Sequence, residues 1–296
     1  MAAVVASLRP QQWTKNLVVF AGVIFSQQLL TARIWLACAA FAIFCLLSGA
    51  IYMLNDVADV DRDRLHPAKR HRPVASGALS RPAALAIGVV LLLGCLVLGF
   101  GMSVRFGLVA TSFALLLTAY TLWFKHMVIL DVLVLAIGFV LRAVAGAVAV
   151  NVNISGWLLI CTLLVALFLA LGKRRHESLS LRGDAADHRP ILAEYSEGFL
   201  DQMIAVVTAC TVIAYALYTM SPETVARFHT RLLPVTLPFV LYGISRYLYL
   251  LYHRELGGNP SDLVLSDRAL LVNTLLWMLV VLSLIYWPRG DSWWKL

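Results

Sequence analysis

Charged side chains are scarce in this chain: they make up 14% of its 296 residues, against about one quarter in an ordinary soluble domain. Hydrophobic residues account for 61%, and the mean hydropathy is +0.83. A soluble globular domain is therefore excluded, and an integral membrane protein is indicated. The five cysteines fall inside apolar runs without paired spacing, which argues against a disulfide framework or a metal site.

Common ligand-binding motifs are also missing. The sequence has no glycine-rich phosphate loop of the G-x-G-x-x-G or Walker type, and its histidines form no H-x-x-H pattern. It contains no low-complexity linker and no internal repeat, so we expect residues 1–296 to form a single membrane domain. Membrane topology and anionic lipid account for the net charge of +8, and nothing indicates nucleic-acid binding.

Apolar runs long enough to cross a bilayer, about 20 residues each, recur along the whole chain. They predict nine transmembrane helices, with approximate cores at 17–31, 33–54, 83–103, 106–124, 128–150, 156–172, 200–220, 232–252 and 269–287. The expected fold class is therefore all-α, a polytopic helical bundle embedded in a lipid bilayer.

The distribution of basic residues predicts the orientation of this bundle. With the N-terminus in the cytoplasm, most of the 24 lysines and arginines fall in cytoplasmic segments, as the positive-inside rule requires. Nearly all the acidic residues fall on the same side, whereas outer connections such as "NVNISG" are short and uncharged. We therefore expect a multi-pass protein of the cell (inner) membrane with its active site on the cytoplasmic side.

One charged stretch, "LNDVADVDRDRLHPAKRHRPVASG", follows the second apolar run. Its first part contains the pattern N-D-x-x-D-x-x-x-D, formed by Asn55, Asp56, Asp59 and Asp63. If the helix continues, offsets of three and four residues place the three aspartates on one face. Carboxylates at that spacing repel one another unless a cation lies between them, and Mg²⁺ commonly shares itself between one or two carboxylates and substrate phosphates.

The structural alternative for this stretch is a solvated acidic helix end, balanced by Arg62 and Arg64. The order of residue types favours a ligand site instead, because Lys69 and Arg72 follow within ten residues and suit phosphate oxygens. Carboxylates that hold a metal beside basic groups describe a diphosphate site. A cation-binding transporter is the non-enzymatic alternative, but charge that clusters at one surface without inverted repeats counts against it.

In this stretch the sequence resembles the UbiA-type intramembrane prenyltransferases. The family's first aspartate motif, NDxxDxxxD, is matched at 55–63, and its K-x-x-R-P followed by S-G is matched within 69–77. Tyr120 and Lys125, in "YTLWFK", resemble the family's tyrosine and lysine after helix four. The resemblance covers the whole chain and implies a nine-helix bundle in which Mg²⁺ binds a substrate diphosphate at the cytoplasmic side.

The second aspartate motif of the family, D-x-x-x-D after helix six, is missing. Its place reads "LGKRRHESLSLRGDAADHRPILAEYSEGFLDQ", in which three cations at 173–175 and then Glu177 stand at the helix end. Asp184 and Asp187 come later at a different spacing, and Asp201 is a surviving acid near helix seven. The cations either flank the membrane as topology signals or bind a second anionic substrate.

Arg142, in "GFVLRAVAGAVAV", is a charge inside a predicted span, where charge is costly and is usually paired or functional. Asp131 lies on the same helix about three turns away, so it is not a direct partner. Arg142 therefore either pairs elsewhere within the bundle or binds an anion near a cavity, and the sequence leaves both interpretations open.

These departures, together with "LRPQQWTKN", "GKRRHE" and "EYSEGFLDQ", resemble one branch of the superfamily, the decaprenyl-phosphate phosphoribosyltransferases of cell-wall arabinan synthesis. In that branch 5-phosphoribosyl 1-diphosphate is the donor, a polyprenyl (decaprenyl) monophosphate is the acceptor, and pyrophosphate is released. The alternative is an ordinary prenyltransferase that joins a polyprenyl diphosphate to an aromatic acceptor, against which the missing second motif counts.

The resemblance implies catalytic roles, with the three aspartates as Mg²⁺ ligands, for Asp56, Asp59, Asp63, Lys69 and Arg72. It implies substrate binding by Asn55, Tyr120, Lys125, Arg142, Lys173, Arg174, Glu177, Tyr195 and Asp201. It does not assign the acceptor phosphate and the donor's 5-phosphate to particular basic residues. The lipid chain length and the association of copies into a homo-oligomer are also left open.

Overall fold

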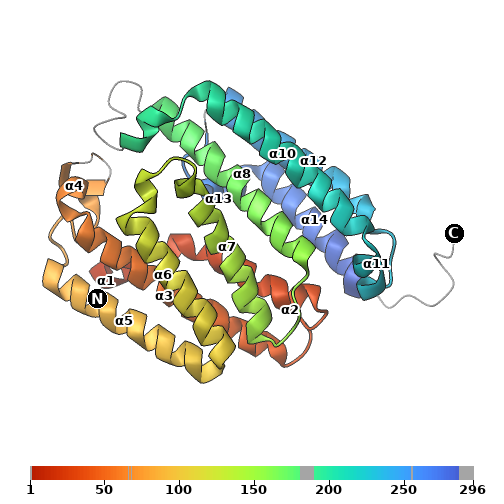
Figure 1. Ribbon diagram of the computed structural model, residues 1–296, viewed down its shortest axis with the longest axis horizontal. Helices are drawn as coiled ribbons and strands as arrows, with labels where there is room; N and C mark the ends of the chain where they lie inside the picture. Colours follow the sequence, from red (N-terminus) through yellow and green to blue (C-terminus); the bar gives the residue numbers. More distant parts are fainter. Residues whose placement is uncertain (1, 66, 68, 181–189, 255, 287–296) are drawn as a thin grey trace. The chain divides into compact units, whose positions relative to one another are not determined.

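The computed structural model describes residues 2–65, 67, 69–180, 190–254 and 256–286. Every regular element in these residues is a helix, which confirms the all-α prediction (Figure 1). Contacts divide the chain into two compact units, Met1–Ile154 and Ser155–Leu296. The first unit holds the N-D-x-x-D-x-x-x-D motif, and the second holds the basic residues 173–175.

The chain is a multi-pass membrane protein. Among the described residues, seven helices are long and apolar enough to cross a bilayer: α3 (Arg33–Ala58), α5 (Arg81–Met102), α6 (Val104–Leu122), α7 (Leu130–Ala149), α8 (Gly156–Ser180), α10 (Glu197–Met220) and α14 (Arg268–Tyr286). Such runs fold as helices because lipid offers no partner for backbone polar groups, so each N–H must bond within its own segment.

The predicted count of nine spans is not confirmed, because two of the predicted segments form shorter helices. The run 17–31 corresponds to the end of η1 (Pro10–Phe20) followed by α2 (Ala21–Phe25). The run 232–252 is divided between η5 (Leu233–Thr236) and α12 (Leu237–His253). Proline has no backbone N–H to donate, and each of η5 and α12 has a proline in its first turn.

Short helices connect the long ones: α1 (Ala2–Ser7), α4 (Val60–Leu65), η2 (Lys69–His71), η3 (Phe124–His126), η4 (Pro190–Glu194), α11 (Pro222–Phe228) and α13 (Pro260–Ser266). Serine caps fix the start of two long helices. The Ser103 hydroxyl accepts a hydrogen bond from the Phe106 N–H at 3.1 Å, and Ser196 does the same for Phe199 at 3.2 Å.

The first unit packs around aromatic side chains on α3 and α6. The Phe44 ring lies 5.8 Å from Phe106 and 5.1 Å from Phe113, measured between ring centroids. All three side chains are fully buried. Helix α5 packs along α3, and α6 packs between α5 and α7. This core holds the middle of α3, whose last turn carries Asn55 and Asp56 at the start of the acidic motif.

In the second unit, α8 packs beside α10, and α12 packs beside α14. The Phe168 ring of α8 contacts the Tyr247 ring of α12 at 5.1 Å between centroids. At the start of α14, two nitrogens of Arg246 bind the Asp267 carboxylate at 2.8 Å and 3.2 Å. These contacts order the ends of α8, α10 and α12, where the charged residues of this unit gather.

Candidate active site

The acidic motif lies where α3 ends and α4 begins. Helix α3 extends past its predicted apolar core, so Asn55 and Asp56 occupy its last turn. Asp59 follows the final helical residue, and Asp63 lies in α4. The Asp63 N–H still donates to the Asp59 carbonyl at 2.9 Å, so the chain continues in a helical path with one break. Asp56 and Asp63 are buried, whereas Asp59 is partly exposed.

Arg72 joins the two buried carboxylates. Its Nη1 atom lies 3.1 Å from Asp56 Oδ1 and 2.6 Å from Asp63 Oδ2. One guanidinium nitrogen therefore occupies the position between two acids that would otherwise repel each other. The sequence predicted the aspartates and Arg72 as parts of one site, and the structure brings them together.

Asp59 has a different partner. Lys125, in η3 after α6, places its Nζ 2.9 Å and 3.0 Å from the two Asp59 carboxylate oxygens. Of the three aspartates expected on one face, Asp56 and Asp63 share a cation, while Asp59 pairs separately because the helix breaks at that residue. Lys125 is thus part of the acidic cluster, and its implied role in substrate binding stays a prediction.

Arg9 is a site residue that the sequence prediction missed. It contacts Asp56 through Nη2, and its guanidinium lies 5.0 Å from the centre of the Tyr52 ring. Burial lowers the pKa of Arg9, an effect that the Asp56 carboxylate opposes. The Arg9 backbone adopts the left-handed region at φ 50°, which is uncommon for a residue with a side chain.

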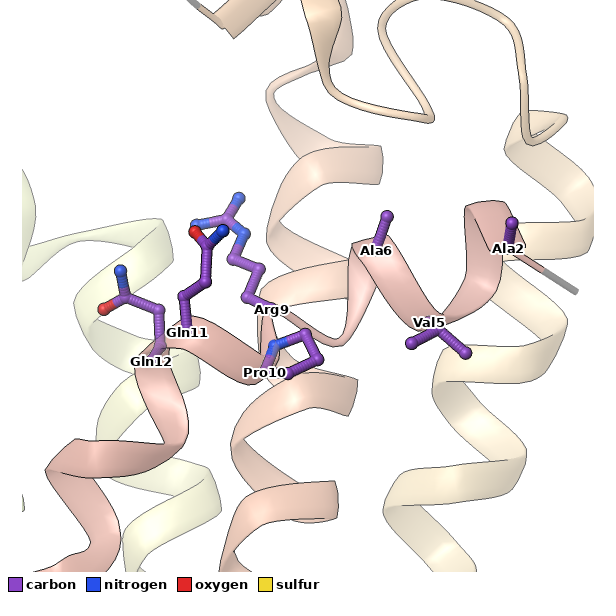
Figure 2. Close-up of a pocket in the computed structure, with 7 residues that line it drawn as sticks. All are labelled: Ala2, Val5, Ala6, Arg9, Pro10, Gln11 and Gln12. Atoms are coloured by element: carbon purple, nitrogen blue, oxygen red, sulfur yellow. The ribbon is translucent and has the colours of Figure 1, made fainter.

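The N-terminal segment around Arg9 forms an open pocket. Figure 2 shows Arg9 and Gln11 extending toward the same side of this segment, beside Gln12. The apolar part of the lining comes from Ala2, Val5, Ala6 and Pro10. Arg9 lies in "LRPQQWTKN", a segment that carries the family resemblance without singling out this residue, and its place before a proline indicates an irregular backbone rather than a ligand site.

The other predicted residues of the first unit are distributed around this cluster. Lys69 lies in η2 and Tyr120 in the last turn of α6; both are partly buried, as is Asn55. Arg142 lies inside α7 and is 4% exposed, and its Nε donates to Asn16 Oδ1 at 2.7 Å. Asn16 was not predicted as a site residue.

The acidic cluster fits a divalent cation whose coordination would be completed by the oxygens of a bound diphosphate. Among the described residues, no three His, Cys, Asp or Glu side chains converge closely enough to hold a metal ion by themselves. Mg²⁺ commonly takes one or two carboxylates and fills its remaining positions with water and phosphate oxygens. Asp56 Oδ2 is buried and has no hydrogen-bond partner, so it has an unused lone pair for such an ion.

In the second unit, the basic residues at the end of α8 pair with acids. Lys173 Nζ lies 3.6 Å from Glu177 Oε1, and Arg174 contacts the other oxygen of the same carboxylate. Arg174 is 2% exposed, so it does not flank the membrane as a lipid-facing charge. The Lys173 side chain remains 39% exposed and is the most accessible cation of this group.

Asp201 is held by Arg175, one of the three cations noted at 173–175, and by Tyr252, which was not predicted. Arg175 Nε lies 2.6 Å from Asp201 Oδ1, and the Tyr252 hydroxyl donates to the same oxygen at 2.9 Å. The Arg175 guanidinium also lies 4.0 Å from the centre of the Tyr252 ring. Tyrosines near a helix end are more often interfacial anchors, so Tyr252 gave no distinct signal.

Three other residues noted in this region of the sequence are Tyr195, Asp184 and Asp187, of which the structure describes Tyr195. Tyr195 is buried, and its ring stacks on Phe199 at 6.1 Å between centroids. Asp184 and Asp187 lie outside the described residues. Within the second unit, Arg175, Tyr252 and the predicted Asp201 form one hydrogen-bonded group.

The chain is therefore a multi-pass helical membrane protein in which acidic and basic side chains meet at the end of a long helix. Within that class, the chain belongs to the UbiA prenyltransferase family, whose model matches residues 16–263. The structure is similar to that of a UbiA homolog from Archaeoglobus fulgidus bound to GPP and Mg²⁺, with a TM-score of 0.74 at 18% identity, covering 96% of this chain and 99% of that one. This likeness shows the fold.

Curated relatives are similar over nearly the whole chain. The decaprenyl-phosphate phosphoribosyltransferase of Corynebacterium glutamicum is 31% identical, over 95% of this chain and 86% of the relative. The protein of the same name from Mycolicibacterium smegmatis is 27% identical, over 97% of this chain and 93% of the relative. The chain is therefore similar to these transferases from end to end.

Proposed function

We propose that the chain transfers 5-phosphoribose from 5-phosphoribosyl 1-diphosphate to a polyprenyl monophosphate, such as decaprenyl phosphate, and releases pyrophosphate. The observation that carries this proposal is the basic end of α8, where the family's second aspartate motif is replaced by three consecutive cations. A phosphate monoester carries more negative charge than an aromatic acid, so three cations suit a second phosphorylated substrate better than an aromatic acceptor. The names of the curated relatives support the same activity.

The aspartate cluster would hold the donor. Asp56, Asp59 and Asp63 would be the ligands of Mg²⁺, which when bound neutralises charge on the diphosphate leaving group. Three cations already form salt bridges with these carboxylates: Arg9, Arg72 and Lys125. Lys69 lies in η2, three residues before Arg72. Fixed cations at this position stabilise the negative charge that develops on the leaving diphosphate.

The reaction would break the bond between the anomeric carbon of the ribose and the diphosphate oxygen, whose electron pair leaves with pyrophosphate. An oxygen of the lipid phosphate would form the new bond from the opposite face. No strong base is needed, because a phosphate is already ionised at neutral pH. Displacement from the opposite face inverts the anomeric centre, so the product is a lipid-linked β-phosphoribose.

Lys173 is the candidate in the second unit to bind a phosphate of the acceptor or the donor. Its side chain is accessible, and its ion pair with Glu177 is long, at 3.6 Å. Arg174, Glu177 and Asp201 would shape this basic region, and Asn55, Tyr120 and Tyr195 would orient polar groups of the substrates. The cell (inner) membrane, with the N-terminus and acidic cluster on the cytoplasmic side, is supported by the asymmetry of lysine and arginine. Cell-wall arabinan synthesis is the corresponding physiological role.

A transfer assay tests this function. The purified chain in detergent would be given Mg²⁺, a polyprenyl phosphate and 5-phosphoribosyl 1-diphosphate labelled in the ribose. We expect Mg²⁺-dependent appearance of label in the organic phase. If no label enters the lipid, while a polyprenyl diphosphate supplied instead is joined to an aromatic acid, the chain is an ordinary prenyltransferase of the family.

A further inference from the structure

Arg142 is a buried cation without a carboxylate partner among the described residues. Its only hydrogen bond there runs from Nε to the neutral amide of Asn16, and its guanidinium lies 4.6 Å from the centre of the Phe113 ring and 5.0 Å from that of Phe139. Ring contacts offset only part of the cost of removing a charge from water. A buried arginine inside a transmembrane helix that has no carboxylate partner among the described residues is therefore a candidate anion site.

Asn16 fixes the direction of this guanidinium. Its Oδ1 accepts from Arg142 Nε, and its Nδ2 donates to Cys45 Sγ at 3.4 Å. The reverse amide orientation would aim an N–H group at another donor, so the two neighbours select one orientation. With Nε engaged, Nη1 and Nη2 have no hydrogen-bond acceptor among the described residues, and they form the planar fork that binds phosphate in bidentate fashion.

Two glycines bring Asn16 and Arg142 together. A Cβ on Gly146, one turn after Arg142 in α7, would lie 1.8 Å from the Val19 carbonyl oxygen of η1. A Cβ on Gly22 would lie 2.6 Å from the Ala147 nitrogen. The close approach of η1 and α2 to α7 depends on both glycines, and it places the amide of η1 against the arginine.

Tyr52 links this arginine to the acidic cluster within the first unit. The Tyr52 ring lies 5.0 Å from the Arg9 guanidinium and also lies near Arg142, and Tyr52 is one turn before Asp56 on α3. Among the described residues its hydroxyl has no hydrogen-bond partner, and the side chain is only partly buried. An anion on Arg142 would thus lie near the donor diphosphate without occupying the aspartates.

We propose that the Nη1 and Nη2 atoms of Arg142 bind a phosphate monoester, and that Asn16 is the residue that positions the guanidinium. This inference rests on the proposed function, which supplies two such groups, the donor's 5-phosphate and the phosphate of the acceptor lipid. It goes beyond that function because it assigns a second phosphate position in the first unit, separate from the aspartate cluster.

The first test uses Arg142→Met, which keeps the length of the side chain and removes the charge. The ligand-free variant should unfold at a temperature no lower than that of the parent chain, because it no longer buries an uncompensated charge. Binding would be followed as the rise in unfolding temperature caused by ribose 5-phosphate or farnesyl phosphate, with ribose and farnesol as controls. We expect the variant to bind one of the two phosphates at least about tenfold more weakly.

The ligand whose affinity falls identifies the source of the phosphate. Loss for ribose 5-phosphate assigns Arg142 to the donor, and loss for farnesyl phosphate assigns it to the acceptor. Arg33→Met is the matched control: Arg33 binds Gln28 and the Val150 carbonyl of the same unit, and this variant should bind both ligands as the parent does. A purely structural Arg142 would give a less stable Arg142→Met that still binds both phosphates, which would overturn the inference.

Asn16→Asp separates positioning from packing. The carboxylate can accept the same hydrogen bond from Nε, so the free chain should become more stable, while neutralising the arginine should weaken phosphate binding at least about tenfold. Increased stability with unchanged phosphate affinity would contradict the proposal. Because these experiments measure binding, they test the role of Arg142 even if the wild-type chain transfers no phosphoribose. If the chain transfers phosphoribose and the Arg142→Met variant binds both phosphates as the parent does, the inference about Arg142 is refuted while the proposed function stands.

Discussion

Asp59 and Asp61 lie two residues apart in contrasting surroundings. Asp59 receives Lys125 at 2.9 Å, whereas the Asp61 side chain is 79% exposed and lies 3.7 Å from Arg64. We therefore predict that Asp59→Asn lowers the initial rate of phosphoribosyl transfer about 10²- to 10³-fold, a typical loss when one preorganised charge is removed. An exposed surface pair contributes little, so Asp61→Asn should stay near the parent rate. Equal losses in both variants would contradict the assignment.

At the scale of single residues, sequence reasoning found the acids but not all of their partners. The aspartates could be predicted because they lie within nine residues of one another, at spacings that a single helical path brings together. Arg9 is separated from Asp56 by 47 residues and was not predicted. Lys125 is separated from Asp59 by 66 residues and was reached only through the family resemblance. Pairing between distant helices depends on the packing, which residue spacing does not encode.

At the scale of helices, the contact of η1 with α7 depends on Gly146. A Cβ there would meet the Val19 backbone, which cannot move as a flexible side chain can. We predict that Gly146→Ala destabilises the protein by about 1–3 kcal/mol, in line with overpacked sites, and lowers the thermal unfolding midpoint in detergent.

Gly94→Ala is the matched control for this prediction. Gly94 lies in α5, and a Cβ there would meet no atom within 4 Å. Alanine should be neutral or stabilise the helix by up to about 1 kcal/mol. Equal destabilisation by both substitutions would show that Gly146 is not required for the close approach of η1 to α7.

The start of α14 supplies a prediction of pH dependence. Hydrogen bonds from Arg246 hold the pKa of Asp267 below its usual range, and Asp267 also accepts from the Leu270 N–H at 2.9 Å as a helix cap. A carboxyl group with a depressed folded pKa contributes stability above its unfolded pKa of about 3.9, and this contribution is lost as pH falls through the folded value.

Asp267→Asn should therefore flatten this part of the pH profile. Asparagine can still cap α14, but it carries no charge for Arg246. We expect the difference in unfolding midpoint between the parent and the variant to shrink as pH is lowered from about 6 toward about 3. A difference that stays constant over this range would show that the ion pair does not contribute.

At the scale of the whole molecule, composition and apolar runs were sufficient for the all-α membrane class. The nine predicted spans are not confirmed: among the described residues, the runs 17–31 and 232–252 form shorter helices than the other seven. The resemblance to the UbiA family is confirmed by the family model and by the similar fold. The charged residues of the second unit were predicted as a region, but the pairing of Arg175 with Asp201 and the part played by Tyr252 emerge only from the packing of α8, α10 and α12.

The proposed reaction joins two phosphorylated substrates, one soluble in water and one soluble in the bilayer. The most direct measurement is the mass of the lipid formed from a polyprenyl phosphate and 5-phosphoribosyl 1-diphosphate, with and without a chelator of Mg²⁺. We expect a polyprenyl phosphate that has gained one phosphoribosyl group, formed only when Mg²⁺ is present. An unchanged polyprenyl phosphate, together with prenylation of an aromatic acid when a polyprenyl diphosphate is supplied, would contradict it.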